Sequence, residues 1–197
     1  KVLTSADSAS WNLAAAGQSV AIALSSILEA RLPAKDAAVS ASPHEVILLD
    51  GSRIGTKTVQ LSNETLTITA AATDSIDLPR SVIGNIRLAE SPSSVDDQWA
   101  ALLERERRED WLVLRKQDKL DFVPGVVSGI TDQHVSLLLE GETVPVPRAK
   151  VFGVILRQRK TSGAKSPGIV ELVSGDRLAV RTVTRKGAEF TLQLAAG

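Results

Sequence analysis

Few residues in this sequence have an ordinary pKa near neutral, where a general base works best. The only histidines are His44, which follows a proline, and His134, which lies where a loop between strands is expected. A serine nucleophile needs such a base within hydrogen-bond reach. Neither histidine lies in a recognisable nucleophile, nucleotide-binding or P-loop motif, and the chain has no cysteine. We therefore predict no catalytic residues and no enzymatic activity.

Pairs of acidic residues are the other groups that could support chemistry. Four such pairs are Asp74 and Asp77, Glu140 and Glu142, Asp96 and Asp97, and Asp118 and Asp121. The first two pairs fall in expected turns, where carboxylates are usually solvated. The last two pairs offer oxygen ligands, but neither has the spaced acidic residues and the glycine of a Ca²⁺ loop. We predict no metal site and no cofactor.

The charge balance does not favour nucleic acid or membranes as partners. The 197 residues carry 23 basic and 23 acidic side chains, so the formal net charge is zero. The densest basic run, Arg157, Arg159, Lys160 and Lys165, lies in a Ser/Gly linker and could contact phosphate without specificity. Base-stacking residues are scarce, with three Trp, three Phe and no Tyr. No apolar run approaches the roughly 18 residues of a membrane-spanning helix.

The strongest pattern in the sequence is an internal repeat. Residues 45–69 align with residues 169–193 without a gap, and Gly51 and the hydrophobic positions keep their phase. A second set of segments, residues 20–32, 76–88 and 144–156, also superposes with its apolar positions in phase. Together the two alignments indicate one structural unit that recurs along the chain.

The second set of segments also repeats a Pro-Arg dipeptide, at Pro79-Arg80 and at Pro147-Arg148. A repeated arginine permits two interpretations. It could contact a ligand that the units share, or it could pair with an acidic turn and cover the wall of the fold with its aliphatic stem. We favour the structural interpretation and assign no binding residues.

The repeats divide the chain into four parts. Residues 1–33 form the back half of a unit, residues 44–90 a complete unit, residues 94–160 a helix followed by a complete unit over 110–158, and residues 166–197 the front half of a unit. Linkers are expected at 33–43, 89–93 and 161–167. An incomplete unit leaves a bare strand edge, so the two partial units could complete each other or pair with other chains.

Each complete unit is predicted to contain five short antiparallel strands. In the first of them, apolar residues alternate around 46–48, 54–59, 66–68, 76–78 and 82–88. Gly51 marks the first turn, because glycine tolerates a positive φ. Five such strands can roll up into a small barrel that leaves no open edge. The predicted fold class is therefore mainly β, with tandem five-stranded small barrels and one amphipathic helix between the two complete units.

The helix is predicted over residues 95–110. Its apolar stripe consists of Val95, Trp99, Leu102 and Leu103. Charged pairs at i and i+4, Glu104 with Arg108 and Arg105 with Glu109, are expected on the solvent face. We expect the stripe to cover the open mouth of the barrel that follows, and the alternative is a helix that binds a partner.

A helix that leads into five strands with a glycine in the first turn resembles the Sm-like fold, a five-stranded SH3-like barrel. The resemblance covers residues 94–157 with the helix and 44–90 without it. It implies RNA binding through an acidic residue, a large apolar residue and an asparagine in the loop that enters the third strand. Of that pattern, the corresponding loops at 61–64 and 131–134 keep only Asn63 and Asp132.

The tandem arrangement also resembles uncharacterised bacterial envelope proteins in which such units precede a carbohydrate-binding module. The matching stretches are residues 46–54, 99–106 and 144–153. The resemblance implies a non-enzymatic structural or interaction scaffold of the cell envelope or of a secreted assembly, with protein partners or self-association. A carbohydrate- or peptide-binding module is the first alternative, and Sm-like RNA binding is the second. A binding module would need exposed aromatics, whereas Trp11, Trp99 and Trp111 are expected in the core.

Overall fold

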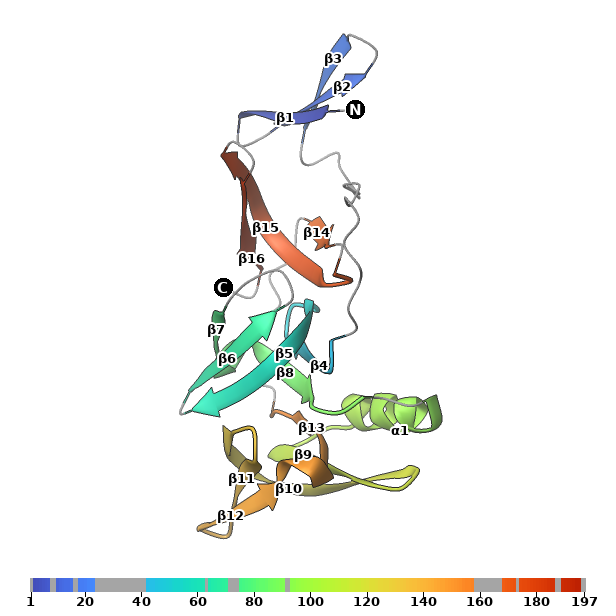
Figure 1. Cartoon of the computed structure of the whole chain (residues 1–197), viewed down its shortest axis with the longest axis vertical. Helices are drawn as coiled ribbons and strands as arrows, with labels where there is room; N and C mark the ends of the chain where they lie inside the picture. Colours follow the sequence, from blue (N-terminus) through green and yellow to red (C-terminus); the bar gives the residue numbers. More distant parts are fainter. Residues whose placement is uncertain are drawn as a thin grey trace.

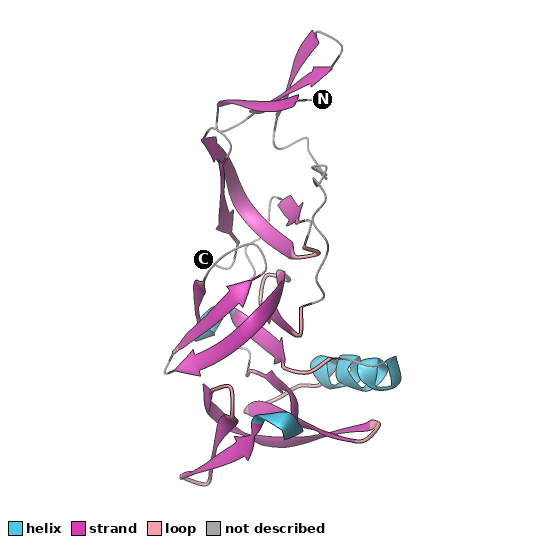
Figure 2. Cartoon of the chain, in the orientation of Figure 1, coloured by secondary structure: helices cyan, strands magenta, loops and turns pink. Residues whose placement is uncertain are grey.

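The computed structural model describes residues 2–7, 10–15, 18–23, 42–62, 64–70, 75–90, 93–157, 168–172, 174–186 and 189–195. These residues form sixteen strands in two antiparallel sheets and, among them, a single α-helix (Figure 2). The predicted mainly β fold with one helix is confirmed. The larger sheet has thirteen strands and the smaller one has three.

Residues 44–90, called repeat A below, hold five of these strands (Figure 1). They are β4 (His44–Leu48), β5 (Arg53–Ser62), β6 (Thr65–Ala70), β7 (Ile76–Pro79) and β8 (Ile83–Arg87), with a 3-10 turn η2 (Arg80–Val82) before the last. Alternate residues of β6 are buried, as the sequence pattern predicts. The strands pair in the order β7-β6-β5-β4-β8, so the fifth strand returns to the first.

Residues 110–157, called repeat B below, have the same strand order. The strands are β9 (Asp110–Lys116), β10 (Lys119–Ile130), β11 (His134–Leu139), β12 (Glu142–Pro147) and β13 (Val151–Ile155), with the 3-10 turn η3 (Arg148–Lys150) before β13. They pair in the order β12-β11-β10-β9-β13. The two repeats therefore agree in strand order and in the place of the 3-10 turn.

The sequence predicted a separate interior for each repeat, but the two repeats share one interior. Their strands belong to one sheet, because β8 pairs with β13 and β5 pairs with β10. Residues from both repeats form one hydrophobic cluster, for example Val46 and Ile86 from repeat A and Leu112 and Val154 from repeat B. The sequence could not show this fusion, because strand pairing between repeats is a long-range contact.

Helix α1 (Ser93–Glu104) ends six residues before the predicted end at residue 110. The amide of Arg105 donates to the carbonyl oxygen of Leu102, which tightens the last turn. Asp110 is already buried as the first residue of β9, so the residues between must lead the chain away from the helix. Because the helix ends at Glu104, the charged pairs predicted with Arg108 and Glu109 do not form on a helix face.

The predicted apolar stripe of α1 does pack on repeat B. Val95, Trp99 and Leu102 are buried against one face of β9 and β13, with Leu103 partly buried beside them. The ring of Trp99 meets that of Phe152 edge-on, with centroids 5.3 Å apart. Residues on the opposite face of the same two strands lie in the shared core, so β9 and β13 are buried on both faces.

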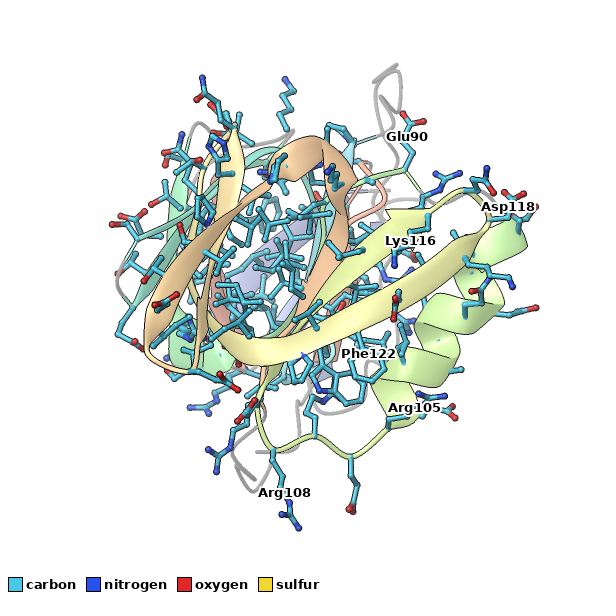
Figure 3. All side chains as sticks on the ribbon, turned by 90° about the horizontal axis from the view of Figure 1, so that it is seen from below. Glu90, Arg105, Arg108, Lys116, Asp118 and Phe122 are labelled. Carbon is cyan, nitrogen blue, oxygen red and sulfur yellow. The ribbon has the colours of Figure 1, made fainter. Side chains whose placement is uncertain are left out.

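Gln98 ties the polar side of α1 to the β9–β10 hairpin. Its side-chain nitrogen donates to the carbonyl oxygen of Asp118 at 2.8 Å, and its side-chain oxygen accepts from the amide of Leu120 at 3.0 Å. In Figure 3, Lys116 and Asp118 lie at the tip of this hairpin beside the helix. The helix is thus held by apolar packing along one stripe and by hydrogen bonds from the Gln98 side chain to the backbone of the hairpin.

The two ends of the chain add three strands each. Strands β1 (Val2–Asp7), β2 (Ser10–Ala15) and β3 (Gln18–Ala23) form the separate three-stranded sheet, while β14 (Gly168–Glu171), β15 (Arg177–Lys186) and β16 (Glu189–Leu194) join the larger sheet next to β5. The described strands of the two ends do not pair with each other. Residues 24–41 and 158–167, which include most of two predicted linkers, lie outside the described residues.

Candidate functional site

The two repeats meet across a local twofold axis at strands β8 and β13. Ile86 lies opposite Val154, and these residues occupy equivalent positions because Ile86 pairs with Val46 in repeat A and Val154 pairs with Leu112 in repeat B. Two further backbone hydrogen bonds obey the same symmetry. The amide of Leu88 donates to Phe152 at 2.8 Å, and the amide of Leu156 donates to Gly84 at 3.0 Å. Such a self-complementary contact is typical of twofold interfaces.

Strands β5 and β10 make a second contact with the same symmetry. Leu61 lies opposite Ile130, and Ser62 lies opposite Gly129. Leu61 and Ile130 are again equivalent, since each is paired within its own repeat to the first core residue of the third strand, Leu66 or Val135. We call the two contacts together the junction.

The repeated arginines stand at the two ends of the junction, and Arg80 crosses it. Its guanidinium donates to the carbonyl oxygen of Val127 and to a carboxylate oxygen of Asp110, at 2.5 Å for the carboxylate. Asp110 also accepts from the amides of Val127 at 3.0 Å and Arg157 at 2.8 Å. The Asp110 side chain is 7% exposed and that of Arg80 is 16% exposed, so this ion pair is largely removed from water. It links repeat A to three segments of repeat B.

Arg148 occupies the equivalent position in repeat B and reaches back to repeat A. Its guanidinium donates to the carbonyl oxygen of Thr131 at 2.9 Å and lies 3.4 Å from Nε2 of His44. His44 begins β4 as Asp110 begins β9, so a histidine stands where the other side of the junction has a carboxylate. Burial and the neighbouring Arg148 lower the pKa of His44 below its ordinary value of 6.5.

A third twofold contact joins repeat A to the C-terminal strands. Arg53 in β5 lies opposite Arg177 in β15, the residue that aligns with it in the sequence repeat. The amide of Gly55 donates to Asp176 at 2.5 Å, and the amide of Ala179 donates to the hydroxyl of Ser52 at 2.8 Å. These two hydrogen bonds are symmetry mates, because Ser52 aligns with Asp176 and Gly55 with Ala179.

Substitution of Ser52 tests this third contact. Ser52→Ala leaves the buried amide of Ala179 without its acceptor, so we expect the free energy of unfolding to fall by about 1–3 kcal/mol. Urea denaturation measures the change. Ser62→Ala, at an exposed position of β5, the strand that begins after Ser52, is the matched control and should alter stability by less than about 0.5 kcal/mol. Equal effects of the two substitutions would show that the hydrogen bond does not stabilise the contact.

The candidate catalytic and metal-binding groups are not brought together. His134 is exposed at the start of β11 and lies opposite Pro147, the residue before the arginine that contacts His44. Of the acidic pairs, Asp77 accepts from Thr67, Asp121 pairs with Lys116, and Asp118 accepts from Ser94. Glu140 and Glu142 flank an exposed turn, Asp96 and Asp97 are exposed on α1, and Asp74 lies outside the described residues. No cluster of three or more metal-ligating side chains occurs in the described part of the chain.

The remaining sequence candidates are also dispersed. Trp99 and Trp111 are each 7% exposed, and the side chain of Trp11 lies outside the described residues. Of the basic run, Arg157 is exposed, whereas Arg159, Lys160 and Lys165 are not described. Asn63 also lies outside the described residues, and Asp132 is exposed in its loop.

The chain matches no protein family, no curated protein and no solved structure. In the residues that the structure describes, no helix is long and apolar enough to cross a membrane. Among the described residues, the most extensive arrangement of polar contacts is at the junction. Sequence reasoning found its arginines through the repeated dipeptide, but it missed Asp110, whose neighbours Arg108, Glu109 and Trp111 suggested only the end of a helix.

Proposed function

We propose that the chain is a non-enzymatic structural or interaction scaffold of a bacterial cell envelope or secreted assembly. We further propose that each repeat is a small barrel of the Sm-like, SH3-like type. The strand order, the 3-10 turn before the fifth strand and the pairing of the fifth strand with the first all support this reading of the repeats. The envelope location rests on the sequence resemblance.

The junction is the observation that supports a scaffold best. The largely buried side chains of Arg80 and Asp110 fix one repeat against the other rather than line a site for a substrate. A fused core and symmetric strand pairing hold the two repeats in one orientation. A rigid element that presents outer surfaces at a fixed spacing is what a scaffold requires.

The alternatives have weaker support. A carbohydrate-binding module would use exposed aromatic rings, but Trp99 and Trp111 pack inside. Strand addition by a peptide at the edge strand β12 is disfavoured by Pro145 and Pro147, which lie on the same edge because they are two residues apart. The ladder between β12 and β11 is continuous, so both proline nitrogens face away from it and block the free edge.

A distance measurement between the repeats tests the proposal. Because the chain has no cysteine, Lys57→Cys in β5 and Lys119→Cys in β10 give two unique exposed sites for spin labels. We expect one narrow distance distribution that does not change when RNA or a set of glycans is added. Asp110→Asn should broaden it, while Asp97→Asn, at an exposed site on α1, is the matched control.

Other outcomes would replace the proposal. A broad distance distribution in the labelled chain with Asp110 intact would mean that the repeats move independently and do not form a scaffold. A salt-sensitive mobility shift with RNA would favour the Sm-like RNA-binding alternative. Saturable binding of a glycan would favour the carbohydrate-binding alternative.

A further inference from the structure

The two ends of the junction carry the same arginine but different partners. Arg80 meets the carboxylate of Asp110, and Arg148 meets the imidazole of His44. The backbone amides of both arginines donate to equivalent carbonyl oxygens, that of Arg80 to Glu64 at 2.7 Å and that of Arg148 to Gln133 at 2.8 Å. The two arginines therefore share their backbone anchor and differ in the groups that their guanidinium groups meet.

The imidazole of His44 can accept a hydrogen bond from Arg148 only when it is neutral. Its Nε2 faces the guanidinium at 3.4 Å, and its Nδ1 is buried without a hydrogen-bond partner among the described residues. When the ring gains a proton, Nε2 becomes a donor and two cations face each other. Protonation thus converts an attraction across the junction into a repulsion.

Other groups around His44 modify this effect without reversing it. From the loop between β10 and β11, Asp132 attracts a protonated ring, and the carbonyl groups of Leu88 and Pro43 also favour it. Burial and Arg148, from η3, act against the proton and outweigh them. Thr56 of β5, which pairs with His44 along the sheet, is uncharged.

We propose that the junction is an acid-sensitive device, in which protonation of His44 expels Arg148 and loosens repeat B from repeat A. The inference rests on the proposed role of the junction in fixing the two repeats. The Arg80–Asp110 pair contains no histidine, so it keeps the other end closed while the His44 end opens. The expected result of acidification is a looser pair of repeats, not an unfolded chain.

The sign of the pH dependence follows from linkage. The folded pKa of His44 lies below 6.5, so between that pKa and 6.5 the unfolded chain binds more protons than the folded one. The contribution of neutral His44 to the free energy of unfolding is therefore complete above pH 6.5. It is lost as the pH falls from 6.5 towards the pKa of His44 in the folded chain. One proton is involved, so the folding equilibrium constant should fall by at most about tenfold per pH unit in this window.

Two measurements test the device in the full chain. The chain has two histidines, so an NMR titration gives two imidazole signals, and His134→Gln assigns them. We expect His44 to titrate below its ordinary value of 6.5, and we expect the label distance between Lys57→Cys and Lys119→Cys to broaden as His44 gains its proton. His44→Gln should remove the broadening, and His134→Gln should keep it.

Substitution of His44 by aspartate gives the sharpest comparison. His44→Asp recreates the partner that Arg80 already has, so the broadening should move to the acid range of a carboxylate. A His44 that titrates at or above pH 6.5, or broadening that persists in His44→Gln, would overturn the device. Either result leaves the scaffold standing, because the scaffold is tested separately, by the label distance distribution at pH 7.5 and by the binding of RNA and glycans.

Discussion

Asp110→Asn is expected to lower the free energy of unfolding by about 3–5 kcal/mol, the cost of breaking a buried ion pair. The substitution preserves the shape of the side chain but removes its charge, so Arg80 is left as a cation with little access to water. It also replaces one carboxylate acceptor oxygen by a donor that faces the amides of Val127 or Arg157. Urea denaturation followed by tryptophan fluorescence measures the loss.

Two controls separate the ion pair from a general effect of removing charge. Asp97→Asn, at an exposed site on α1, should change stability by less than about 0.5 kcal/mol. Replacing both partners, Arg80→Met with Asp110→Leu, should restore much of the stability, because a buried pair of apolar groups leaves no charge uncompensated. If the double variant is as unstable as Asp110→Asn, the backbone hydrogen bonds of Asp110 matter more than its charge.

Phe152→Ala is expected to cost about 3–5 kcal/mol, the usual range for removing a buried phenylalanine. Phe152 is fully buried under α1 and meets the ring of Trp99. Without it the helix loses the centre of its docking surface, so the near-UV circular dichroism of the tryptophans should weaken together with stability. Thermal denaturation measures the loss of stability, and the near-UV spectrum measures the loss of tryptophan packing.

Phe190→Ala is the matched control for this substitution. The residue type is the same, but Phe190 in β16 is 43% exposed. We expect a change of less than about 1 kcal/mol and an unaltered near-UV spectrum. Equal losses for Phe152 and Phe190 would contradict the description of α1 as a helix seated on a buried aromatic pair.

The sequence predicted well those features that depend on neighbouring residues in the chain. All five strands of repeat A lie where alternation placed them, and Gly51 adopts a φ of 86°, as the first turn requires. Its counterpart Gly175 adopts 88°, so the aligned segments share a turn conformation. Repeat B has a longer first hairpin, in which Gln117 adopts a φ of 56°. Because glycine is expected at such a position, the sequence did not predict this turn.

The parts that depend on distant contacts could not be predicted. Every residue of β13 is buried, so its sequence has no alternation to show which face meets the core or which strand lies beside it. The helix end was missed because Asp110 looks like a helical acidic residue until its partners are known. The role of Arg80 was left between ligand and structure, because its partner lies thirty positions along the chain.

The outer faces of the two repeats show why α1 packs on repeat B rather than on repeat A. Where repeat B has Trp111 and Ile155 under α1, repeat A has Glu45 and Arg87 at the equivalent positions. Glu45 lies 3.6 Å from Arg87 and 3.4 Å from Arg53, and these charges would be costly to cover with an apolar helix. Composition on one face of two strands thus decides where the helix can dock.

The twofold arrangement of the repeats within one polypeptide has a consequence for how the protein can change. In an assembly of two identical subunits, every substitution at such an axis is made twice and its effect is doubled. Here the two sides are encoded by separate codons, so one side can be altered while the other preserves attachment. His44 and Asp110 are already such a divergent pair, and each can be tuned without the other.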